Sequence, residues 1–207
     1  MKADIETNPV PSNLARVLSA GHFAVAAELS PPRGVNLEAI QRDAQILKDN
    51  ADAVNVTDNQ AASVRMASIP VSSLLVGQGV EPVAQMTCRD RNRLAIQSDL
   101  LGAAALGVRN LLCLSGDHGR WGDHPHAKNV YDLDSTHLIR LARNMVERGC
   151  LDNGRTIKPP PEFFIGAAAN PFAPPYDYRP YRLAKKVAAG ARFIQTQLIF
   201  NIERFRE

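Results

Sequence analysis

Polar side chains recur at the ends of short apolar segments, and their types suit hydrogen bonding to a ligand. Carboxylates, amides and hydroxyls close six such segments: Glu28; Thr57, Asp58 and Asn59; Gln85 and Thr87; Ser115, Gly116 and Asp117; Asn170; Gln195 and Gln197. These groups can meet the several donor and acceptor edges of a polar heterocycle. We therefore expect a binding site for a flat polar molecule.

Two carboxylates are candidates for chemistry. Glu28 stands within the otherwise apolar run that leads from Phe23 to Leu29. Such a position predicts partial desolvation, which favours the protonated form near neutral pH and suits a general acid, although structural ion pairs also use buried carboxylates. Asp117 follows Gly116, which permits close approach of a ligand; a turn or a helix cap would use the same residues. Both alternatives stay open for each residue.

The remaining reactive side chains carry weaker signals. Arg89, Arg91 and Arg93 open a predicted helix, where they either face solvent or hold a phosphate or carboxylate. Histidines 118, 124 and 126 share a loop with glycines and a proline, and no cysteine or carboxylate pattern completes a metal site there. The cysteines are odd in number and far apart, so Cys88 and Cys113 are expected to be ordinary buried thiols.

Composition predicts one soluble globular domain spanning 1–207. The chain is 45% hydrophobic and 22% charged, and no apolar run reaches the ~18 residues of a membrane span. The N-terminal residues carry no signal-peptide pattern, so we expect a cytoplasmic protein. A net charge of +3 without one long basic block disfavours nucleic acid and suits an anionic small molecule.

Short apolar segments alternate with segments of helical periodicity, which is typical of βα units in a parallel sheet. The predicted strands are 23–29, 53–57, 83–87, 110–115, 164–169 and 193–200. Helix caps are predicted at Asn36 and at Asp134 or Ser135, and helix ends at Gly107, Gly149 and Gly190.

No glycine-rich dinucleotide fingerprint follows the first strand, so the α/β fold is predicted to be a (β/α)8 TIM barrel. About six βα units are present, whereas a closed barrel typically needs about 250 residues. We expect a C-terminally incomplete barrel, either a fragment or one completed by a partner, because an open parallel sheet exposes its edges. The active site of such a barrel lies at the carboxyl ends of its strands.

Together the strand-end residues resemble the methylenetetrahydrofolate reductase family. The matching motifs are Ala27-Glu28-Leu29-Ser30-Pro31-Pro32-Arg33, Val56-Thr57-Asp58-Asn59, Met86-Thr87-Cys88-Arg89-Asp90-Arg91-Asn92, Leu114-Ser115-Gly116-Asp117, Ala169-Asn170-Pro171, and Lys186-Val187 followed by Ala189-Gly190-Ala191 and Thr196-Gln197. The arginine run and the Ser115-Gly116-Asp117-His118 motif look like the acetogen-type or methyltransferase-fused branch. Gln85 and Ala173 stand where members often carry histidine.

The resemblance implies a flavoprotein oxidoreductase of one-carbon metabolism and methionine biosynthesis. It would reduce 5,10-methylenetetrahydrofolate to 5-methyltetrahydrofolate by ping-pong hydride transfer from NADH or NADPH through FAD. Glu28 looks like the general acid, Asp117 like the pterin-binding carboxylate, and Gln197 like the amide that contacts folate and nicotinamide in turn. Positions that look like cofactor contacts are Thr57, Asp58, Thr87, Ser115, Gly116, Asp117, Tyr131, Asn170 and Lys186. A homo-oligomer or a partner subunit is expected.

Two alternatives remain. The chain could be a non-catalytic flavin- and folate-binding subunit of a larger reductase or methyltransferase complex. It could also be a flavin-free folate methyltransferase barrel that keeps pterin contacts at Asp117 and Asn170. A bound flavin spectrum and a stoichiometric co-purifying protein would separate these alternatives.

Overall fold

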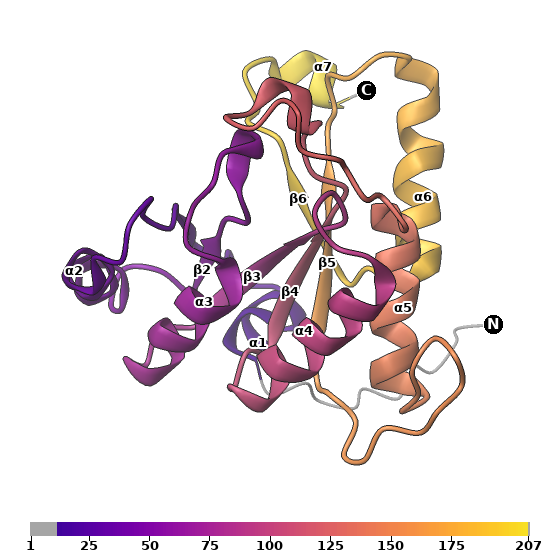
Figure 1. The fold of residues 1–207 in the computed structure, drawn as a ribbon. Coiled ribbons are helices and arrows are strands. Elements are labelled where there is room, and N and C mark those ends of the chain that lie inside the picture. The colour runs from indigo at the N-terminus through magenta and orange to yellow at the C-terminus, as the bar shows by residue number, and fades with distance from the viewer. Residues whose placement is uncertain (1–11, 207) are drawn as a thin grey trace.

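The computed structural model describes residues 12–206, which build one curved parallel sheet with most of its helices on the outer face (Figure 1). The strands lie side by side in sequence order: β1 (Ala26–Leu29), β2 (Ala53–Val56), β3 (Pro82–Thr87), β4 (Asn110–Leu114), β5 (Phe164–Ala169) and β6 (Phe193–Thr196). Each strand pairs in parallel with the next. The predicted α/β barrel class is confirmed as a six-stranded half-barrel.

Seven α-helices and three short 3-10 helices connect and flank the strands of the described residues. The α-helices are α1 (Asn13–Ser19), α2 (Leu37–Leu47), α3 (Ser68–Gly77), α4 (Arg93–Ala105), α5 (Ser135–Glu147), α6 (Arg179–Ala189) and α7 (Ile202–Arg206). The 3-10 helices are η1 (Gln60–Ala62), η2 (Gly119–Trp121) and η3 (Tyr176–Tyr178). None of the helices in residues 12–206 is both long and apolar enough to cross a membrane.

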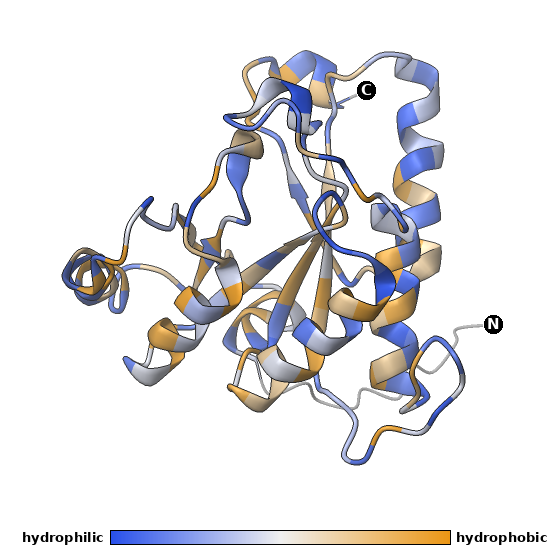
Figure 2. Cartoon of the chain, viewed as in Figure 1, coloured by the Kyte–Doolittle hydropathy of each residue, from blue (hydrophilic) through white to orange (hydrophobic). Residues whose placement is uncertain are grey.

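The central strands β2, β3 and β4 bury both of their faces. Successive side chains of a strand point to opposite sides, so the valines at 54 and 56 pack outward against α2 and α3. Met86 and Cys113 likewise pack outward among residues of α4 and α5. Figure 2 shows hydrophobic residues along the strands and on the flanking helices, while the loops beyond the strand ends are mainly hydrophilic. The loops beyond the strand ends therefore carry the polar groups that a binding site needs.

Helix α1 fills the inner face at the amino ends of the strands. Leu14 of α1 packs there with residues from four strands, namely Ala53, Val83, Leu112 and Phe164. The carboxylate of Glu81, just before β3, accepts hydrogen bonds from the backbone N–H groups of Asn13 and Leu14 at 2.5 and 2.7 Å. A carboxylate at a helix N-terminus is favourable. The inner face is thus closed at one end, and a cavity can form only toward the carboxyl ends.

Neither α1 nor α3 was predicted from the sequence. Helix α1 has only seven residues, too few to show a periodic stripe. Helix α3 contains Pro70 in its first turn and is apolar nearly all round, so it lacks the alternation of faces that marks a helix. The predicted caps fared better: Asn36 accepts from Ala39 N, Asp134 accepts from His137 N, and Gly107, Gly149 and Gly190 all have positive φ at helix ends.

The first and last predicted strands were too long. β1 begins at Ala26 and not at residue 23, and β6 ends at Thr196 and not at residue 200. Phe23 and Phe200 are 91% and 86% exposed. Both strands lie at the edges of the sheet, where pairing on one side supports fewer residues than apolar composition suggests. The other four strands agree with the prediction within one residue at each end.

A glycine permits close packing between the last two strands. The ring of Phe193 stacks on Phe164 with centroids 5.0 Å apart, and a Cβ at Gly166 would lie 2.2 Å from Phe193 Cζ. The ring covers the inner face below Gln195, whose side chain points to the same side two residues further on. Gly166 is therefore required by packing.

We expect Gly166→Ala to lower the free energy of unfolding by about 1–3 kcal/mol, because the added methyl overpacks the inner face. Gly102→Ala in α4 is the matched control. A methyl there meets no atom within 4 Å, so the change should stabilise the helix by up to about 1 kcal/mol. Urea unfolding measures both variants. An unfolding midpoint for Gly166→Ala equal to that of the unsubstituted chain would contradict this packing.

Candidate functional site

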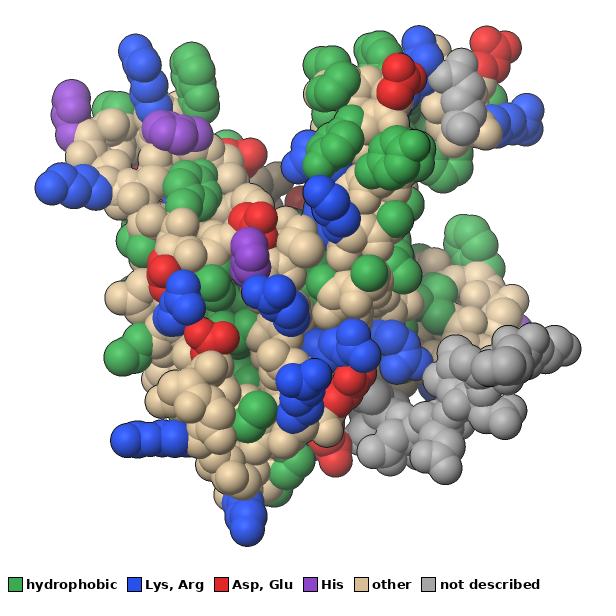
Figure 3. All heavy atoms as spheres, turned by 90° about the vertical axis from the view of Figure 1, so that its right-hand side faces the viewer, with side chains coloured by type: hydrophobic (Ala, Val, Ile, Leu, Met, Phe, Trp, Pro, Cys, Tyr) green, Lys and Arg blue, Asp and Glu red, His purple; other side chains and the backbone are tan. Residues whose placement is uncertain are grey.

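A cavity of about 1120 Å³ opens at the carboxyl ends of the strands and receives residues from or just beyond all six of them. Figure 3, which faces the α5 and α6 side, shows the molecule divided at this end into two lobes with a hollow between them. Ten of the predicted site residues line the cavity: Glu28, Thr57, Asp58, Thr87, Ser115, Gly116, Asp117, Asn170, Lys186 and Gln197. Tyr131 does not line the cavity, but its hydroxyl donates to the carbonyl oxygen of Gly116, which does, at 3.2 Å.

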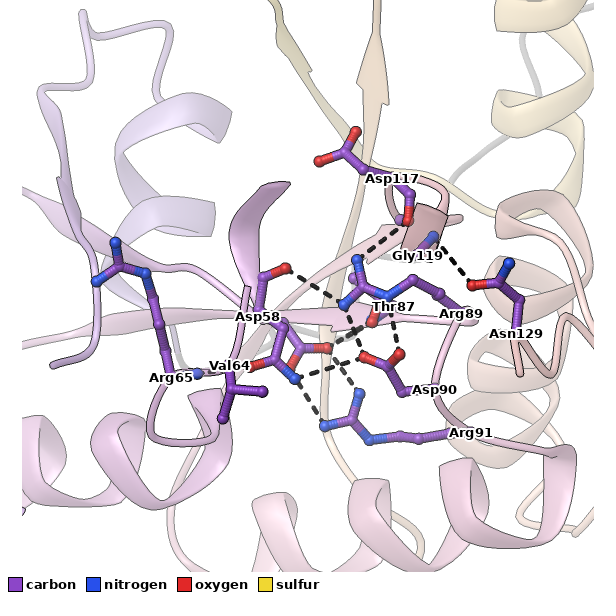
Figure 4. A network of polar contacts seen from close by, with 12 residues as sticks. Asp58, Val64, Arg65, Thr87, Arg89, Asp90, Arg91, Asp117, Gly119 and Asn129 are labelled. Carbon is purple, nitrogen blue, oxygen red and sulfur yellow. Dashed lines mark hydrogen bonds and ion pairs between the residues drawn. The ribbon is translucent and has the colours of Figure 1, made fainter. Parts of the chain in front are cut away.

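Asp58 is the most enclosed charge of the site, with a side chain that is 0% exposed. Its carboxylate accepts from the backbone N and Oγ1 of Thr87 at 2.9 and 2.8 Å. It also accepts from both terminal nitrogens of Arg91 at 2.7 and 3.2 Å (Figure 4). The carboxylate therefore ties the end of β2 to the end of β3 and to the start of α4.

Arg89 joins three of the strand-end loops. Its guanidinium binds the carboxylate of Asp90 at 2.8 and 2.7 Å and donates to the carbonyl oxygens of Asp117 and Asn59 at 3.1 and 3.2 Å (Figure 4). The hydrogen bond between the pair raises the pKa of Arg89 and lowers the pKa of Asp90. Both groups therefore stay charged at neutral pH and hold the loops after β2, β3 and β4 together.

The arginine run makes ion pairs within the protein, and Arg93 also faces solvent, with 49% of its side chain exposed. Arg91 also donates to Asp99, and Arg93 pairs with Asp132 and Asp152 at 2.9 Å each. All three arginines are thus held by carboxylates of the protein. The run is an ion-pair network, which only the fold could reveal because its partners lie up to 59 residues away.

Glu28 reaches the cavity from β1, but the expected desolvation is not found. The residue is exposed, because β1 is the edge strand of the half-barrel and pairs only with β2 among the described strands. Its carboxylate lines the cavity directly. The structure therefore places Glu28 at the cavity, but the expected partial burial of its side chain is wrong.

Asp117 anchors a strained loop over the cavity. Its carboxylate accepts from the backbone N of Ala61 at 3.2 Å, within η1. Asn59, Ala61 and Ala62 all have positive φ, a conformation that costs non-glycine residues energy and is found at functional sites. Asp117 is thus neither the cap of η2, which is His118, nor a simple turn residue.

Thr57 carries a signal that points to a ligand. The residue is 1% exposed and lines the cavity, yet its Oγ1 has no hydrogen-bond partner among residues 12–206. Buried polar groups are nearly always hydrogen-bonded, and each exception calls for an explanation. A ligand that hydrogen-bonds to Oγ1 supplies one.

The opposite wall of the cavity is basic. Arg179, Arg182 and Lys186 recur at helical spacing on α6 and line the cavity; we call them the α6 wall. Lys186 donates to the carbonyl oxygen of Ala168, and burial together with nearby Arg182 lowers the pKa of its ammonium. Sequence reasoning found only Lys186, although the i, i+3, i+7 spacing of the three cations was readable.

An aromatic residue flanks this wall. The ring of Tyr176 makes cation–π contacts with two guanidinium groups, those of Arg179 at 4.3 Å and Arg204 at 4.5 Å from its centroid. All three residues line the cavity. Sequence reasoning missed Tyr176 and Arg204, because cation–π contacts between η3 and α7 depend on how the chain folds back over the cavity.

The cysteines behave as predicted, and the histidine loop forms hydrogen bonds of its own. Cys88 and Cys113 are buried. Burial, with a smaller effect of Asp134, raises the pKa of Cys88 to about 12, so this thiol is protonated at neutral pH. His124 binds Asp123 at 2.8 Å, and within residues 12–206 no three His, Cys, Asp or Glu side chains gather as a metal site requires.

Comparison with known proteins decides the family. The sequence matches the family described as "Methylenetetrahydrofolate reductase" over residues 13–207. The chain belongs to this family. It is 29% identical to "Probable methylenetetrahydrofolate reductase (NADPH)" of Caenorhabditis elegans over 94% of its length, and 31% identical to "Methylenetetrahydrofolate reductase 2" of Schizosaccharomyces pombe over 73%. These alignments cover 29% and 23% of the two relatives, so the chain spans less than a third of either.

Solved structures support the barrel fold of this methylenetetrahydrofolate reductase family member. A Clostridium thermocellum protein described as binding two copies of 5-methyl-5,6,7,8-tetrahydrofolic acid superposes with a TM-score of 0.58 at 11% identity, over 93% of this chain and 61% of that one. The 2,3-dimethylmalate lyase of the PEP mutase/isocitrate lyase superfamily gives 0.58 at 14% identity, over 93% and 64%. At these identities the likeness shows the fold alone.

We expect Asp58→Asn to lower the free energy of unfolding by about 3 kcal/mol, because it leaves the partly buried Arg91 without its main counter-charge. Arg93→Gln is the control, since Arg93 is 49% exposed and its ion pairs are screened by solvent. Its effect in urea unfolding should be clearly smaller. Equal losses in the two variants would show that Asp58 does not organise the site.

Proposed function

We propose that the cavity binds FAD and a tetrahydrofolate, and that the protein reduces 5,10-methylenetetrahydrofolate to 5-methyltetrahydrofolate with NADH or NADPH as donor. Family membership supports this activity, and the observation that carries it is the cavity at the carboxyl ends of the strands, which polar side chains from or just beyond the strands line. The description of the Clostridium protein, which binds a methylated tetrahydrofolate on the same fold, agrees with a folate ligand.

The residues of the cavity fit a flavin dinucleotide. The volume of the cavity, about 1120 Å³, exceeds the roughly 300–1,000 Å³ typical of a single small-molecule pocket. The unpartnered Oγ1 of Thr57 can hydrogen-bond to one edge of a flat ring system. The α6 wall offers three cations to a diphosphate. Ser115, Gly116 and Asn170 complete the contacts implied by the family resemblance, and Tyr131 supports Gly116 from behind.

Asp58 and Thr87 have a structural role in this site and do not contact the cofactor in this proposal. Both were expected to contact the cofactor, and both line the cavity, but the carboxylate of Asp58 is occupied by Thr87 and Arg91. We propose that they fix the strand ends on which the ligand-binding residues stand.

The chain's own residues then supply binding and a proton. Glu28 donates its proton to the ring nitrogen of the folate as the bond between that nitrogen and the bridging carbon breaks, so the electron pair of the bond stays on nitrogen. Asp117 accepts an N–H of the pterin, and the Gln197 amide contacts folate and nicotinamide in turn. Bound here, the flavin supplies hydride transfer between the reduced nicotinamide and the folate carbon.

A second candidate is a non-catalytic flavin- and folate-binding subunit. The observation that favours it is the exposure of Glu28, which stands on an edge strand. In that case the cavity binds both molecules, and the proton donor works only after another chain covers the β1 edge. Activity that appears only when a second protein is added would select this candidate.

The assignment of Glu28 predicts a split between half-reactions. With FAD bound, Glu28→Gln should slow oxidation of the reduced flavin by methylenetetrahydrofolate by about 10²–10⁴-fold, because it removes the acid. Reduction of the flavin by the nicotinamide should be unchanged. Stopped-flow absorbance follows both steps. Glu38→Gln, on exposed α2 outside the cavity, serves as control. Full folate turnover by Glu28→Gln would refute the role.

The unpartnered hydroxyl of Thr57 predicts an effect on affinity without an effect on folding. Thr57→Val should weaken FAD binding about fivefold, which corresponds to one hydrogen bond of about 1 kcal/mol, and should not destabilise the fold. Ser72→Ala is the matched control, because Ser72 Oγ is also buried and unpartnered but lies in α3 outside the cavity. FAD titration by fluorescence and urea unfolding report the two quantities. Equal affinities for the two variants would show that Oγ1 does not meet the flavin.

A further inference from the structure

We infer that Asn55 is a positioning residue for the acid, whose Oδ1 accepts a hydrogen bond from the protonated carboxyl of Glu28. The inference rests on the proposed function of Glu28. It concerns a residue outside the family motifs quoted above, in the middle of β2.

Asn55 and Glu28 lie opposite each other on one face of the sheet. In the parallel register of β1 and β2, Glu28 is the direct partner of Asn55. The flanking residues Val54 and Val56 pack outward against the helices, so the side chain of Asn55 points inward. Glu28 lines the cavity on that inner side. Neighbouring strands are about 4.8 Å apart, so side chains in register can touch.

The amide oxygen of Asn55 is buried without a donor. Asn55 is 5% exposed, and Oδ1 has no hydrogen-bond partner among the described residues. Val83, its partner in register, and Ala53, two residues earlier, are apolar, and the polar Thr57 and Gln85 further along the same face do not donate to Oδ1. A buried acceptor without a donor destabilises a fold. Asn55 itself does not line the cavity, but its in-register partner Glu28 does, so the carboxyl of Glu28 is the group placed to supply the donor.

The protonation state of Glu28 decides whether a donor exists. An ionised carboxylate only accepts hydrogen bonds, whereas a protonated carboxyl donates one. Asn55 Oδ1 can therefore bind the protonated form and is repelled by the ionised form. Hydrogen bonding to the neutral form keeps the proton on the acid until substrate takes it. The same bond fixes the direction in which the carboxyl points.

Other charges in the cavity bear on Glu28 as well. Asp58 and Arg89 are neutralised by Arg91 and Asp90. Asp117, Asp177, Arg204 and the α6 wall also line the cavity. The effect of Asn55 is therefore read from a change between variants that leave all of these groups in place, and not from the pH profile of one protein.

Asn55→Leu tests the inference with FAD bound. The folate half-reaction should slow about three- to tenfold at pH 8, as expected for the loss of one hydrogen bond to the protonated acid. The pH at which this rate falls should move downward, while the rate at low pH stays within about twofold. Flavin reduction by the nicotinamide should not change. Ser72→Ala, which removes another buried unpartnered oxygen outside the cavity, is the control.

Asn55→Asp gives the opposite expectation and keeps the test decisive if the leucine variant unfolds. A second carboxylate beside Glu28 favours the protonated acid by like-charge repulsion, so the fall in rate should move to higher pH. Unshifted profiles in both folded variants, with Glu28→Gln inactive toward folate, would overturn the role of Asn55 alone. A fully active Glu28→Gln would overturn the proposed acid and this inference together.

Discussion

The geometry of the site rests on the hydrogen bonds and ion pair that the buried carboxylate of Asp58 forms with Thr87 and Arg91. A carboxylate taken out of water is costly unless its oxygens are bound, and here Thr87 and Arg91 bind them. Those bonds fix the ends of β2 and β3 relative to the start of α4. Arg89, two residues before Arg91, donates to the carbonyl oxygens of Asn59 and Asp117, and these hydrogen bonds hold the loops after β2 and β4 in place. The side chains that face the ligand from the loops after β2, β3 and β4 are therefore positioned by these ion pairs and hydrogen bonds.

Apart from Arg89, which is paired with Asp90, the cations of the cavity gather on one side, where Asp177 is the one carboxylate among the lining residues. The carboxylates of Glu28 and Asp117 come from β1 and from the loop after β4, whereas the α6 wall and Arg204 lie beyond β5 and β6. A ligand with a diphosphate at one end and a hydrogen-bonding ring system at the other matches this division. Helix α1 closes the inner face below, so a ligand reaches these groups from the carboxyl ends of the strands. The arrangement agrees with an oxidoreductase whose cofactor carries the redox chemistry and whose residues orient substrate and supply a proton.

Much of this arrangement was readable from sequence, for identifiable reasons. Buried parallel strands such as β2 to β5 are mainly apolar, and the polar residue that follows or ends each strand marks the site directly, as at Thr57, Thr87 and Ser115. Non-local chemistry was not readable. Nothing near Arg93 in sequence predicts Asp152 as its partner, and nothing near Tyr176 predicts Arg204. Exposure of Glu28 was also missed, because it depends on where β1 lies in the sheet and not on the composition of the strand.

Binding of a flavin in the cavity is measured by a visible absorption spectrum. The purified chain is incubated with FAD, and free cofactor is removed by gel filtration. We predict that the protein retains the visible absorption of oxidised flavin, at close to one FAD per chain. NADH or NADPH should bleach this absorption, and methylenetetrahydrofolate should restore it. A colourless protein after gel filtration would contradict the account.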